Sequence, residues 1–179
     1  MIYFTRHGLT EYNKQQRFQG ILDIPLCAEG ISQAEAMAEK LKDTHIDIIY
    51  TSPLKRAFKT AEIVNRYHNA EIIITDALIE FDVGRFVEGK TLAQLPENIH
   101  AKLYDETKNY FGEEDIKAFR DKVFGFLRSL ENTDKDYLLV SHGGVYTQIE
   151  QHLIGELKAE EIDNCSPVAL TKNGTNTFL

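Results

Sequence analysis

The stretch Tyr137-Leu138-Leu139-Val140-Ser141-His142-Gly143-Gly144 decides the fold of this chain. Its first five residues form an apolar run that ends at a polar residue, a pattern typical of a strand buried on both faces of a sheet. Residues 144–154 follow directly and are expected to form a helix. A buried strand that passes straight into a helix indicates an α/β fold.

The same alternation extends along the whole chain. Glu29–Lys42 carries apolar residues at helical spacing, whereas Ile46–Thr51 is a β-branched run typical of a strand. Further strands are predicted at Ile2–Thr5, Glu71–Thr75 and Val168–Thr171, and further helices from Ser52 onward and at Glu113–Leu130. Ser52 is the expected N-cap of its helix, with Pro53 in the first turn. The predicted fold class is therefore α/β, with a mainly parallel central sheet and helices on both faces.

The composition restricts the classes of protein to which the chain can belong. With 179 residues, 42% of them hydrophobic, the chain suits one domain with a substantial core. Its net charge of -8 argues against a general nucleic-acid binder, although a small site for an anionic substrate is compatible with it. The two cysteines, Cys27 and Cys165, form no disulfide framework, and the sequence shows neither a signal peptide nor an apolar span of about 20 residues. We therefore expect a cytoplasmic protein that binds neither nucleic acid nor membrane, and the sequence indicates no oligomeric state.

The residues that follow each predicted strand are candidates for a site, because ligands of parallel α/β sheets bind beyond the carboxyl ends of the strands. Arg6-His7-Gly8 follows the first strand, and His142-Gly143 follows the strand at 137–141. Ser52 and Arg56 follow the second strand, and Glu80 comes shortly after the third. Each of these residues alone has an ordinary explanation, such as a turn or a solvated side chain, but chance does not readily place all of them at strand ends. Two histidines, two arginines and one carboxylate are expected to meet at one edge.

This combination of side chains suits the transfer of a phosphoryl group. Two arginines form a planar clamp for a phosphate or a carboxylate, and glycines beside the histidines let backbone N–H groups approach an anion. A neutral histidine can attack phosphorus, and nearby arginines lower its pKa by repulsion between like charges. A glutamate can protonate the leaving oxygen and later accept a proton from water. The scheme requires no metal and no cofactor.

Four segments resemble the signature segments of the histidine phosphatase superfamily, which includes cofactor-dependent phosphoglycerate mutases and many phosphatases. They are Arg6-His7-Gly8-Leu9-Thr10-Glu11-Tyr12-Asn13, Thr51-Ser52-Pro53-Leu54-Lys55-Arg56-Ala57, Leu78-Ile79-Glu80-Phe81-Asp82-Val83-Gly84 and Val140-Ser141-His142-Gly143-Gly144-Val145. The match runs in order over most of the chain. The family fold is a three-layer α/β/α sandwich of the phosphoglycerate mutase type, so the resemblance implies that residues 1–179 form a single domain of this kind.

The resemblance also implies a role for each matched residue. It implies that His7 is the nucleophile that becomes phosphohistidine, and that Glu80 is the proton donor. It implies a phosphate pocket formed by Arg6, Arg56 and His142. Further substrate contacts are implied for Asn13, Gln19, Gly20 and Gly143. The family uses no metal in catalysis. The stretch between Gly84 and Glu88 departs from the usual spacing, which leaves Asp82 and Glu88 as alternative proton donors.

Three functions are compatible with such a set of residues. The mutases of the family carry a larger insertion after the acid segment, and usually an asparagine where this chain has Gly144. A short and open site favours hydrolysis, so the prediction is a metal-independent phosphatase that acts on a small phosphorylated metabolite. A cofactor-dependent phosphoglycerate mutase is the alternative. A non-catalytic phosphate-binding module is a second alternative, which the complete set of chemical groups disfavours.

The segment at about 90–112 is expected to lie over the site as a short cap and to set which substrate fits. Arg85, Lys90 and Lys102 are candidates for contact with a second anionic group of the substrate. Phosphosugars, phosphoglycerate-like acids and nucleoside phosphates are the candidate substrates.

Overall fold

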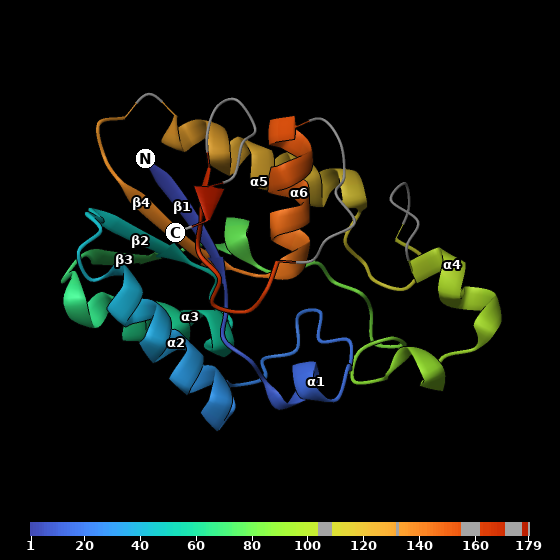
Figure 1. Cartoon of the computed structure of the whole chain (residues 1–179). Helices are drawn as coiled ribbons and strands as arrows, with labels where there is room; N and C mark the ends of the chain where they lie inside the picture. Colours follow the sequence, from blue (N-terminus) through green and yellow to red (C-terminus); the bar gives the residue numbers. More distant parts are fainter. Residues whose placement is uncertain (104–108, 132, 155–161, 171–176, 179) are drawn as a thin grey trace.

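A central sheet with helices packed on both of its faces dominates the structure (Figure 1). The computed structural model describes residues 1–103, 109–131, 133–154, 162–170 and 177–178. Its strands, in the spatial order β3-β2-β4-β1-β5-β6, are β1 (Ile2–Arg6), β2 (Ile48–Thr51), β3 (Glu71–Ile74), β4 (Tyr137–Ser141), β5 (Val168–Leu170) and β6 (Thr177–Phe178). Its α-helices are α1 (Glu11–Lys14), α2 (Ala28–Leu41), α3 (Lys55–Val64), α4 (His100–Leu103), α5 (Ile116–Leu130) and α6 (Gly143–Ile154). The predicted three-layer α/β/α arrangement is confirmed.

Strands β1 to β4 run parallel to one another. Arg6 at the end of β1 is opposite Ser141 at the end of β4, and Thr51 at the end of β2 is opposite Val140. Strands β5 and β6 are antiparallel to their neighbours. The prediction of a mainly parallel sheet is confirmed, and the segments that leave β1, β2 and β4 emerge side by side at one edge.

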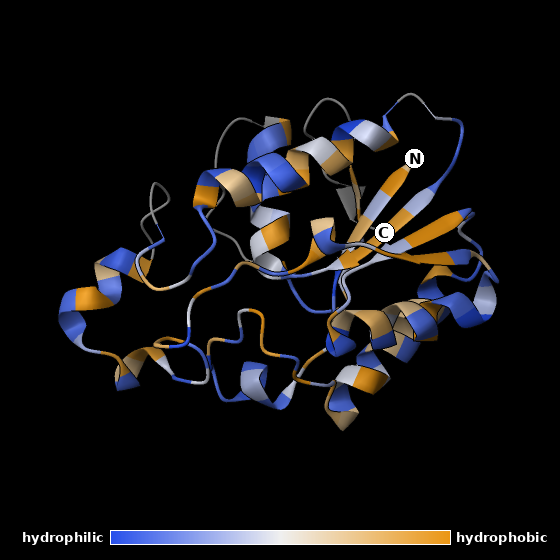
Figure 2. Cartoon of the chain, turned by 180° about the vertical axis from the view of Figure 1, so that it is seen from behind, coloured by the Kyte–Doolittle hydropathy of each residue, from blue (hydrophilic) through white to orange (hydrophobic). Residues whose placement is uncertain are grey.

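Strand β4 is buried at all five of its positions because the sheet is covered on both sides. Alternate side chains of a strand point to opposite faces. Leu138 and Val140 therefore join one core, whereas Tyr137 and Leu139 join the other. Figure 2 shows the consequence, with largely hydrophobic strands lying between helices of mixed hydropathy.

Helices α2 and α3 lie on one face of the sheet, and α5 and α6 lie on the other (Figure 1). Helices α2 and α3 pack on one face through side chains spaced three or four residues apart, namely Ala34, Met37, Ala38, Leu41, Ala57, Ala61 and Val64. Helix α5 packs on the other face, beside α6, through Phe119, Val123, Leu127 and Leu130. Such spacing places the apolar residues on one side of a helix, which is why the periodicity of the sequence predicted these elements.

The prediction that Ser52 caps the helix after β2 is wrong. Helix α3 begins at Lys55, and the residue at its N-cap position is Leu54, whose side chain makes no capping bond. The N–H of Lys55 is bound instead by Asp23 Oδ1, at 2.7 Å. A residue from a distant loop thus satisfies the helix end, which leaves the Ser52 hydroxyl for other contacts. The predicted start of the later helix at Glu113 is also too early, because Asp115 caps α5 by accepting the N–H of Ala118.

The described part of the chain from about residue 83 to α4 extends away from the sheet beyond its carboxyl edge (Figure 1). This segment has a small core of its own, in which Val87, Leu95 and Ile99 are buried against Phe18 and Phe111. Backbone hydrogen bonds between Phe18 and residues 89 and 90 attach it to the loop after α1. Residues 104–108 of the predicted cap segment lie outside the described residues.

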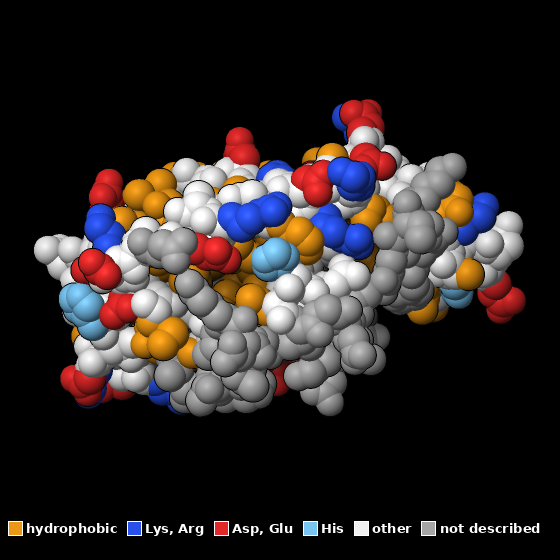
Figure 3. All heavy atoms as spheres, turned by 90° about the horizontal axis from the view of Figure 1, so that it is seen from above, with side chains coloured by type: hydrophobic (Ala, Val, Ile, Leu, Met, Phe, Trp, Pro, Cys, Tyr) orange, Lys and Arg blue, Asp and Glu red, His pale blue; other side chains and the backbone are white. Residues whose placement is uncertain are grey.

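The outer surface of the α5–α6 layer carries hydrophobic, basic and acidic side chains side by side (Figure 3). Among the residues that the structure describes, no helix is both long and apolar enough to cross a bilayer.

Candidate active site

Two histidines lie next to each other at the carboxyl ends of β1 and β4. The N–H of His7 donates to the carbonyl of Ser141, at 2.9 Å, which continues the β1–β4 pairing by one residue. The ring centroids of His7 and His142 are 5.1 Å apart, and both side chains are almost fully buried. The parallel register thus brings together two residues that are 135 positions apart in the sequence.

The hydrogen-bond partners of His7 determine which ring nitrogen carries its proton. Nδ1 lies 2.7 Å from the carbonyl oxygen of Gly8, which can only accept a hydrogen bond. Nδ1 therefore carries the hydrogen, and Nε2 has a lone pair that accepts from Nε of Arg56, at 3.2 Å. Nε2 is the nitrogen that can act as a nucleophile.

Arg56 is held rigidly although it is charged and only 1% exposed. It lies in the first turn of α3, where Nη1 and Nη2 donate to the carbonyl oxygens of Leu22 and Gly20. Burial lowers its pKa to about 10, and the carboxylates of Glu80 and Asp23 oppose this shift. The side chain therefore stays cationic at neutral pH, beside Nε2 of His7.

Arg6 approaches the same cluster from the last position of β1. Its Nη1 donates to the carbonyl of Ile162, at 3.0 Å. A Cβ added at Gly143 would lie 3.7 Å from the Arg6 guanidinium carbon, so the guanidinium packs against the start of α6. Arg6 and Arg56 together give the cluster two fixed positive charges.

His142 is turned toward β2. Its Nε2 lies 2.8 Å from Oγ of Ser52, the residue that directly follows that strand. Its Nδ1 is buried and has no hydrogen-bond partner among the described residues. One ring nitrogen of His142 is thus held by the protein, whereas the other makes no hydrogen bond to the described residues.

Glu80 reaches the cluster from the segment after β3 and contacts the first turn of α6. Its Oε2 accepts the N–H of Gly144, at 3.2 Å, and its Oε1 accepts the N–H of Phe81, at 2.8 Å. A Cβ on residue 144 would lie only 2.3 Å from Oε1, so the absence of a side chain at Gly144 allows this approach. The carboxyl group is therefore adjacent to the residue pair 142–143.

The surroundings shift the pKa of each titratable side chain in a consistent way. The pKa values of His7 and His142 lie well below the ordinary 6.5, first because of burial and then because of the nearby Arg56 charge. Burial raises the pKa of Glu80 above its ordinary 4.5, against the two backbone hydrogen bonds and the charges of Arg56 and Arg6. The histidines are thus kept neutral, and the carboxyl group is biased toward its protonated form.

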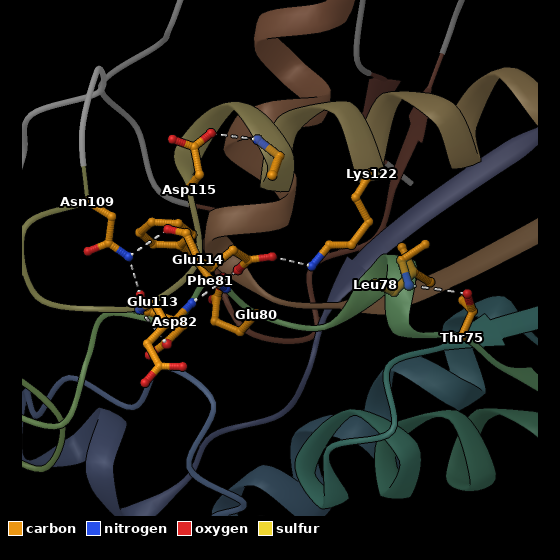
Figure 4. Close-up of polar contacts among 12 residues, drawn as sticks. Thr75, Leu78, Glu80, Phe81, Asp82, Asn109, Glu113, Glu114, Asp115 and Lys122 are labelled. Carbon is orange, nitrogen blue, oxygen red and sulfur yellow. Dashed lines mark hydrogen bonds and ion pairs between the residues drawn. The ribbon is translucent and has the colours of Figure 1, made fainter.

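The two alternative carboxylates have other partners. Asp82 accepts the N–H of Gly84 through Oδ1 and the N–H of Glu113 through Oδ2. It therefore joins the chain just before the cap segment to the chain just after it, and Figure 4 shows Asp82 beside Glu113. Glu88 accepts the N–H of Ile21 at 3.1 Å, and burial raises its pKa. Only Glu80, of the three, has a described contact with the α6 terminus.

The remaining predicted residues lie in α1 and in the loop that follows it. Oδ1 of Asn13 and Oε1 of Gln19 both lie 2.9 Å from the hydroxyl of Thr10, so they organise this loop. Gly20 presents its carbonyl to Arg56 and has a φ of +50°, with Val83 and Glu88 close to its Cα. The structure thus brings Arg6, His7, Arg56, Glu80, His142 and Gly143 together. Gly20 supports Arg56 through its carbonyl, whereas Asn13 and Gln19 contact Thr10.

Four supporting contacts were not predicted from the sequence. Ser52 binds His142, Thr60 accepts the N–H of Gly8, Asn164 donates to the carbonyl of His7, and Ile162 accepts from Arg6. Ser52 could have been found, because it follows a strand just as the histidines do. Asn164 and Ile162 precede an antiparallel strand and carry no such signal.

Two other features are remote from this cluster. His45, Asp47 and Asp136 have ligand atoms within 4.8 Å of one another, but they lie before β2 and β4, at the amino edge of the sheet. A cavity of about 550 Å³, lined mainly by apolar residues such as Leu127, Leu130 and Leu153, lies beneath the α5–α6 layer near Met1. Neither contains a residue of the predicted site.

Comparisons with known proteins agree with this arrangement. The family model of the histidine phosphatase superfamily (branch 1) matches residues 2–177. The uncharacterized phosphatase PhoE of Bacillus subtilis (strain 168) is 35% identical over 172 residues, which are 91% of this chain and 83% of that protein.

Two similar solved structures carry the names of different activities. A mutant phosphoserine phosphatase from Entamoeba histolytica in complex with phosphoserine gives a TM-score of 0.82 at 26% identity, covering 99% of this chain and 93% of that one. The phosphoglycerate mutase from Thermus thermophilus gives a TM-score of 0.75 at 29% identity, covering 93% and 90%. The chain therefore belongs to the histidine phosphatase superfamily, branch 1, and is an enzyme of that family.

Proposed function

We propose that the protein is a metal-independent phosphomonoester hydrolase, which acts on a small phosphorylated metabolite through a phosphohistidine at Nε2 of His7. The state of His7 carries this proposal. Its Nδ1 is bound to the Gly8 carbonyl, its Nε2 has a lone pair, and an arginine N–H already contacts that nitrogen. A buried neutral imidazole between two guanidinium groups is poised to attack an anionic phosphoryl group.

In the first step, Nε2 of His7 attacks phosphorus, and the bond from phosphorus to the leaving oxygen breaks. Glu80 in its acid form gives its proton to that oxygen, so an alcohol leaves and Glu80 becomes a carboxylate. Arg6, Arg56 and His142 bind the three phosphoryl oxygens on which the charge is spread, and the N–H of Gly143 contributes the dipole of α6. The raised pKa of Glu80 supports its role as the acid.

In the second step, water attacks the phosphorus of phosphohistidine. The Glu80 carboxylate takes a proton from the water, the bond between phosphorus and Nε2 breaks, and inorganic phosphate is released. The net reaction consumes one water per ester and returns His7 and Glu80 to their starting states. One carboxyl group thus serves as acid in the first step and as base in the second.

The charge of the cluster supports a reaction without a metal. Arg6 and Arg56 provide the positive charge that a divalent cation provides in other phosphoryl-transfer sites. Their combined charge would also repel such a cation from the space beside His7.

We infer that residues 1–179 form one domain in which the segment at about 90–112 acts as a cap and sets the substrate. Two of its candidate basic residues are already engaged, since Lys90 donates to the carbonyl of Phe86 and Lys102 lies over the Tyr110 ring. Phosphoserine is the first substrate to test, because a similar structure contains it. Phosphosugars, phosphoglycerate-like acids and nucleoside phosphates complete the panel.

A phosphoglycerate mutase is the alternative function, and the similarity to a solved mutase favours it. A mutase must keep its phosphoenzyme away from water between two transfers. Two features of the sequence favour hydrolysis. The segment after Glu80 is short, and Gly144 occupies the position at which mutases of the family usually have asparagine.

The test is hydrolysis of p-nitrophenyl phosphate in the presence of EDTA, with the wild type beside His7→Ala. We expect wild-type turnover that survives EDTA, no turnover by the variant, and an acid-labile phosphoenzyme in the wild type only. Loss of activity with EDTA would contradict metal independence. An inactive wild type that transfers phosphate between phosphoglycerates when bisphosphoglycerate is added would favour the mutase.

A further inference from the structure

We propose that the hydroxyl of Ser52 sets the tautomer of His142, so that the imidazole carries its hydrogen on Nδ1 and donates it to a phosphoryl oxygen. This inference rests on the proposed function and adds a positioning residue to it. It arises from Ser52, which the sequence predicted to be a helix cap and which the structure instead places against His142.

The hydrogen bonds of Ser52 leave its hydroxyl one direction in which to donate. Oγ accepts the N–H of Leu54, at 3.3 Å, and the residue has no solvent exposure. A hydroxyl group has one hydrogen and two lone pairs. Nε2 of His142, at 2.8 Å, is the described acceptor within reach of the Ser52 hydrogen.

The two tautomers of His142 differ in how many buried polar groups they leave without a hydrogen bond. If Nε2 carried the hydrogen, it would occupy the second lone pair of Oγ, and the buried Ser52 O–H would lose its acceptor. The bare lone pair of Nδ1 would then also face a bound anion. If Nδ1 carries the hydrogen, Ser52 donates to Nε2, and both groups are satisfied.

The unpartnered Nδ1 supports the second tautomer. This nitrogen is buried without a hydrogen-bond partner in the described parts of the chain, in a ring that lies 5.1 Å from His7 and close to Arg6 and Arg56. An N–H in that position is a donor preorganised for a phosphoryl oxygen. A neutral histidine can donate there only when its tautomer is fixed, and a hydrogen bond to its second nitrogen is the usual way to fix it.

The test reads the tautomer directly, from long-range proton–nitrogen correlation spectra of the protein labelled with 15N at its six histidines. The His142 signals are assigned by their loss in His142→Gln. We expect wild-type His142 to have a protonated Nδ1 and an unprotonated Nε2 at neutral pH, and we expect inorganic phosphate to shift the Nδ1–H signal. A wild-type Nε2–H tautomer, or an Nδ1–H signal that saturating phosphate leaves unmoved, would overturn the proposal.

Three variants separate positioning from stability. Ser52→Ala should move the hydrogen to Nε2 or average the two states, and should lower kcat by roughly tenfold to a hundredfold. Ser52→Thr, which keeps the hydroxyl, should have the wild-type tautomer of His142 and a kcat close to that of the wild type. Ser141→Ala is the matched control, because it removes another fully buried hydroxyl, one that donates to the Leu78 carbonyl, and should keep the wild-type tautomer. If Ser52→Ala fails to fold, the tautomer of His142 in the wild type and in Ser52→Thr still tests the proposal.

Failure of the proposed role of Ser52 can be distinguished from failure of the proposed phosphatase function. The spectra require no turnover, so an Nδ1–H tautomer in an enzyme without hydrolytic activity would refute the function alone. Hydrolysis by a wild type with the Nε2–H tautomer would refute the role of Ser52 alone. Retention of the Nδ1–H tautomer in Ser52→Ala would also refute that role.

Discussion

Replacement of Gly144 by alanine should impair the acid function of Glu80 while leaving the nucleophile intact. The new Cβ would lie 2.3 Å from Oε1 of Glu80, whereas ordinary contacts of a Cβ begin at 3.4 Å. The φ of Gly144 is not positive, so alanine fits its backbone, and the carboxyl group is the part that must retreat. The retreat is about 1 Å, and a misplacement of this size typically costs roughly 100-fold in rate, or about 2.7 kcal/mol of transition-state stabilisation.

The assay compares two leaving groups. p-Nitrophenolate departs without a proton, whereas the alkoxide of phosphoserine must be protonated as it leaves. In Gly144→Ala we therefore expect kcat/KM for phosphoserine, or for whichever alkyl phosphate the panel identifies, to fall by roughly 100-fold. The value for p-nitrophenyl phosphate should change little.

Gly125→Ala supplies the matched control for this comparison. Gly125 lies on the exposed side of α5, and nothing is within 4 Å of an added Cβ. The substitution should raise the free energy of unfolding by roughly 0.5–1 kcal/mol and leave both rates unchanged. Equal losses on the two substrates in Gly144→Ala, or an unchanged rate on the alkyl phosphate, would refute the argument.

Substitutions at Arg56, Glu80 and Asp82, and a change of pH, test the same geometry. Arg56→Lys should lower kcat by roughly 100-fold and should also reduce Tm, because one ammonium group cannot replace the three directed hydrogen bonds to His7, Gly20 and Leu22. Phosphatase assays measure the loss of kcat, and thermal unfolding measures the loss of Tm. The pKa values of His7 and His142 lie below 6.5 in the folded protein, so near and below that pH the unfolded chain binds more protons than the folded one. Tm should therefore fall as the pH is lowered from neutrality, and it should fall less steeply in His7→Asn. Thermal unfolding measured across the pH range checks both expectations. Glu80→Gln should lose turnover of the alkyl phosphate selectively, which the same two-substrate assay checks. Asp82→Asn should keep turnover but lower the free energy of unfolding by about 1–3 kcal/mol, because Asp82 accepts the backbone N–H groups of Gly84 and Glu113. Urea unfolding measures that loss.

Much of the fold was predictable because burial leaves a periodic trace in the sequence. The apolar run Tyr137–Ser141 is buried on both faces, and the helical spacing in α2 and α5 matches the side chains that reach the cores. The bounds of the elements were less predictable, because distant residues decide them. Asp23 binds the N–H of Lys55, and α3 begins two residues later than the Ser-Pro pair suggests.

The chemical groups of the site were also predictable, since residues that follow parallel strands share one edge. Arg6, His7, Arg56, Glu80 and His142 were all expected there, and the structure places them together. The sequence left three candidates for the proton donor. The structure separates them, since Asp82 and Glu88 bind backbone N–H groups of loops, whereas Glu80 contacts the start of α6.

The sequence by itself determined which groups are present and along which edge they emerge, because both depend on local periodicity and on the direction of the strands. Only the tertiary structure decided how each group is held. The tautomer of His7 depends on the carbonyl of Gly8 and on Arg56, and the contact of His142 with Ser52 joins residues that are 90 positions apart. Hydrogen bonds and pKa shifts depend on distances of a few ångströms between remote parts of the chain, and periodicity along the sequence carries no information about those distances.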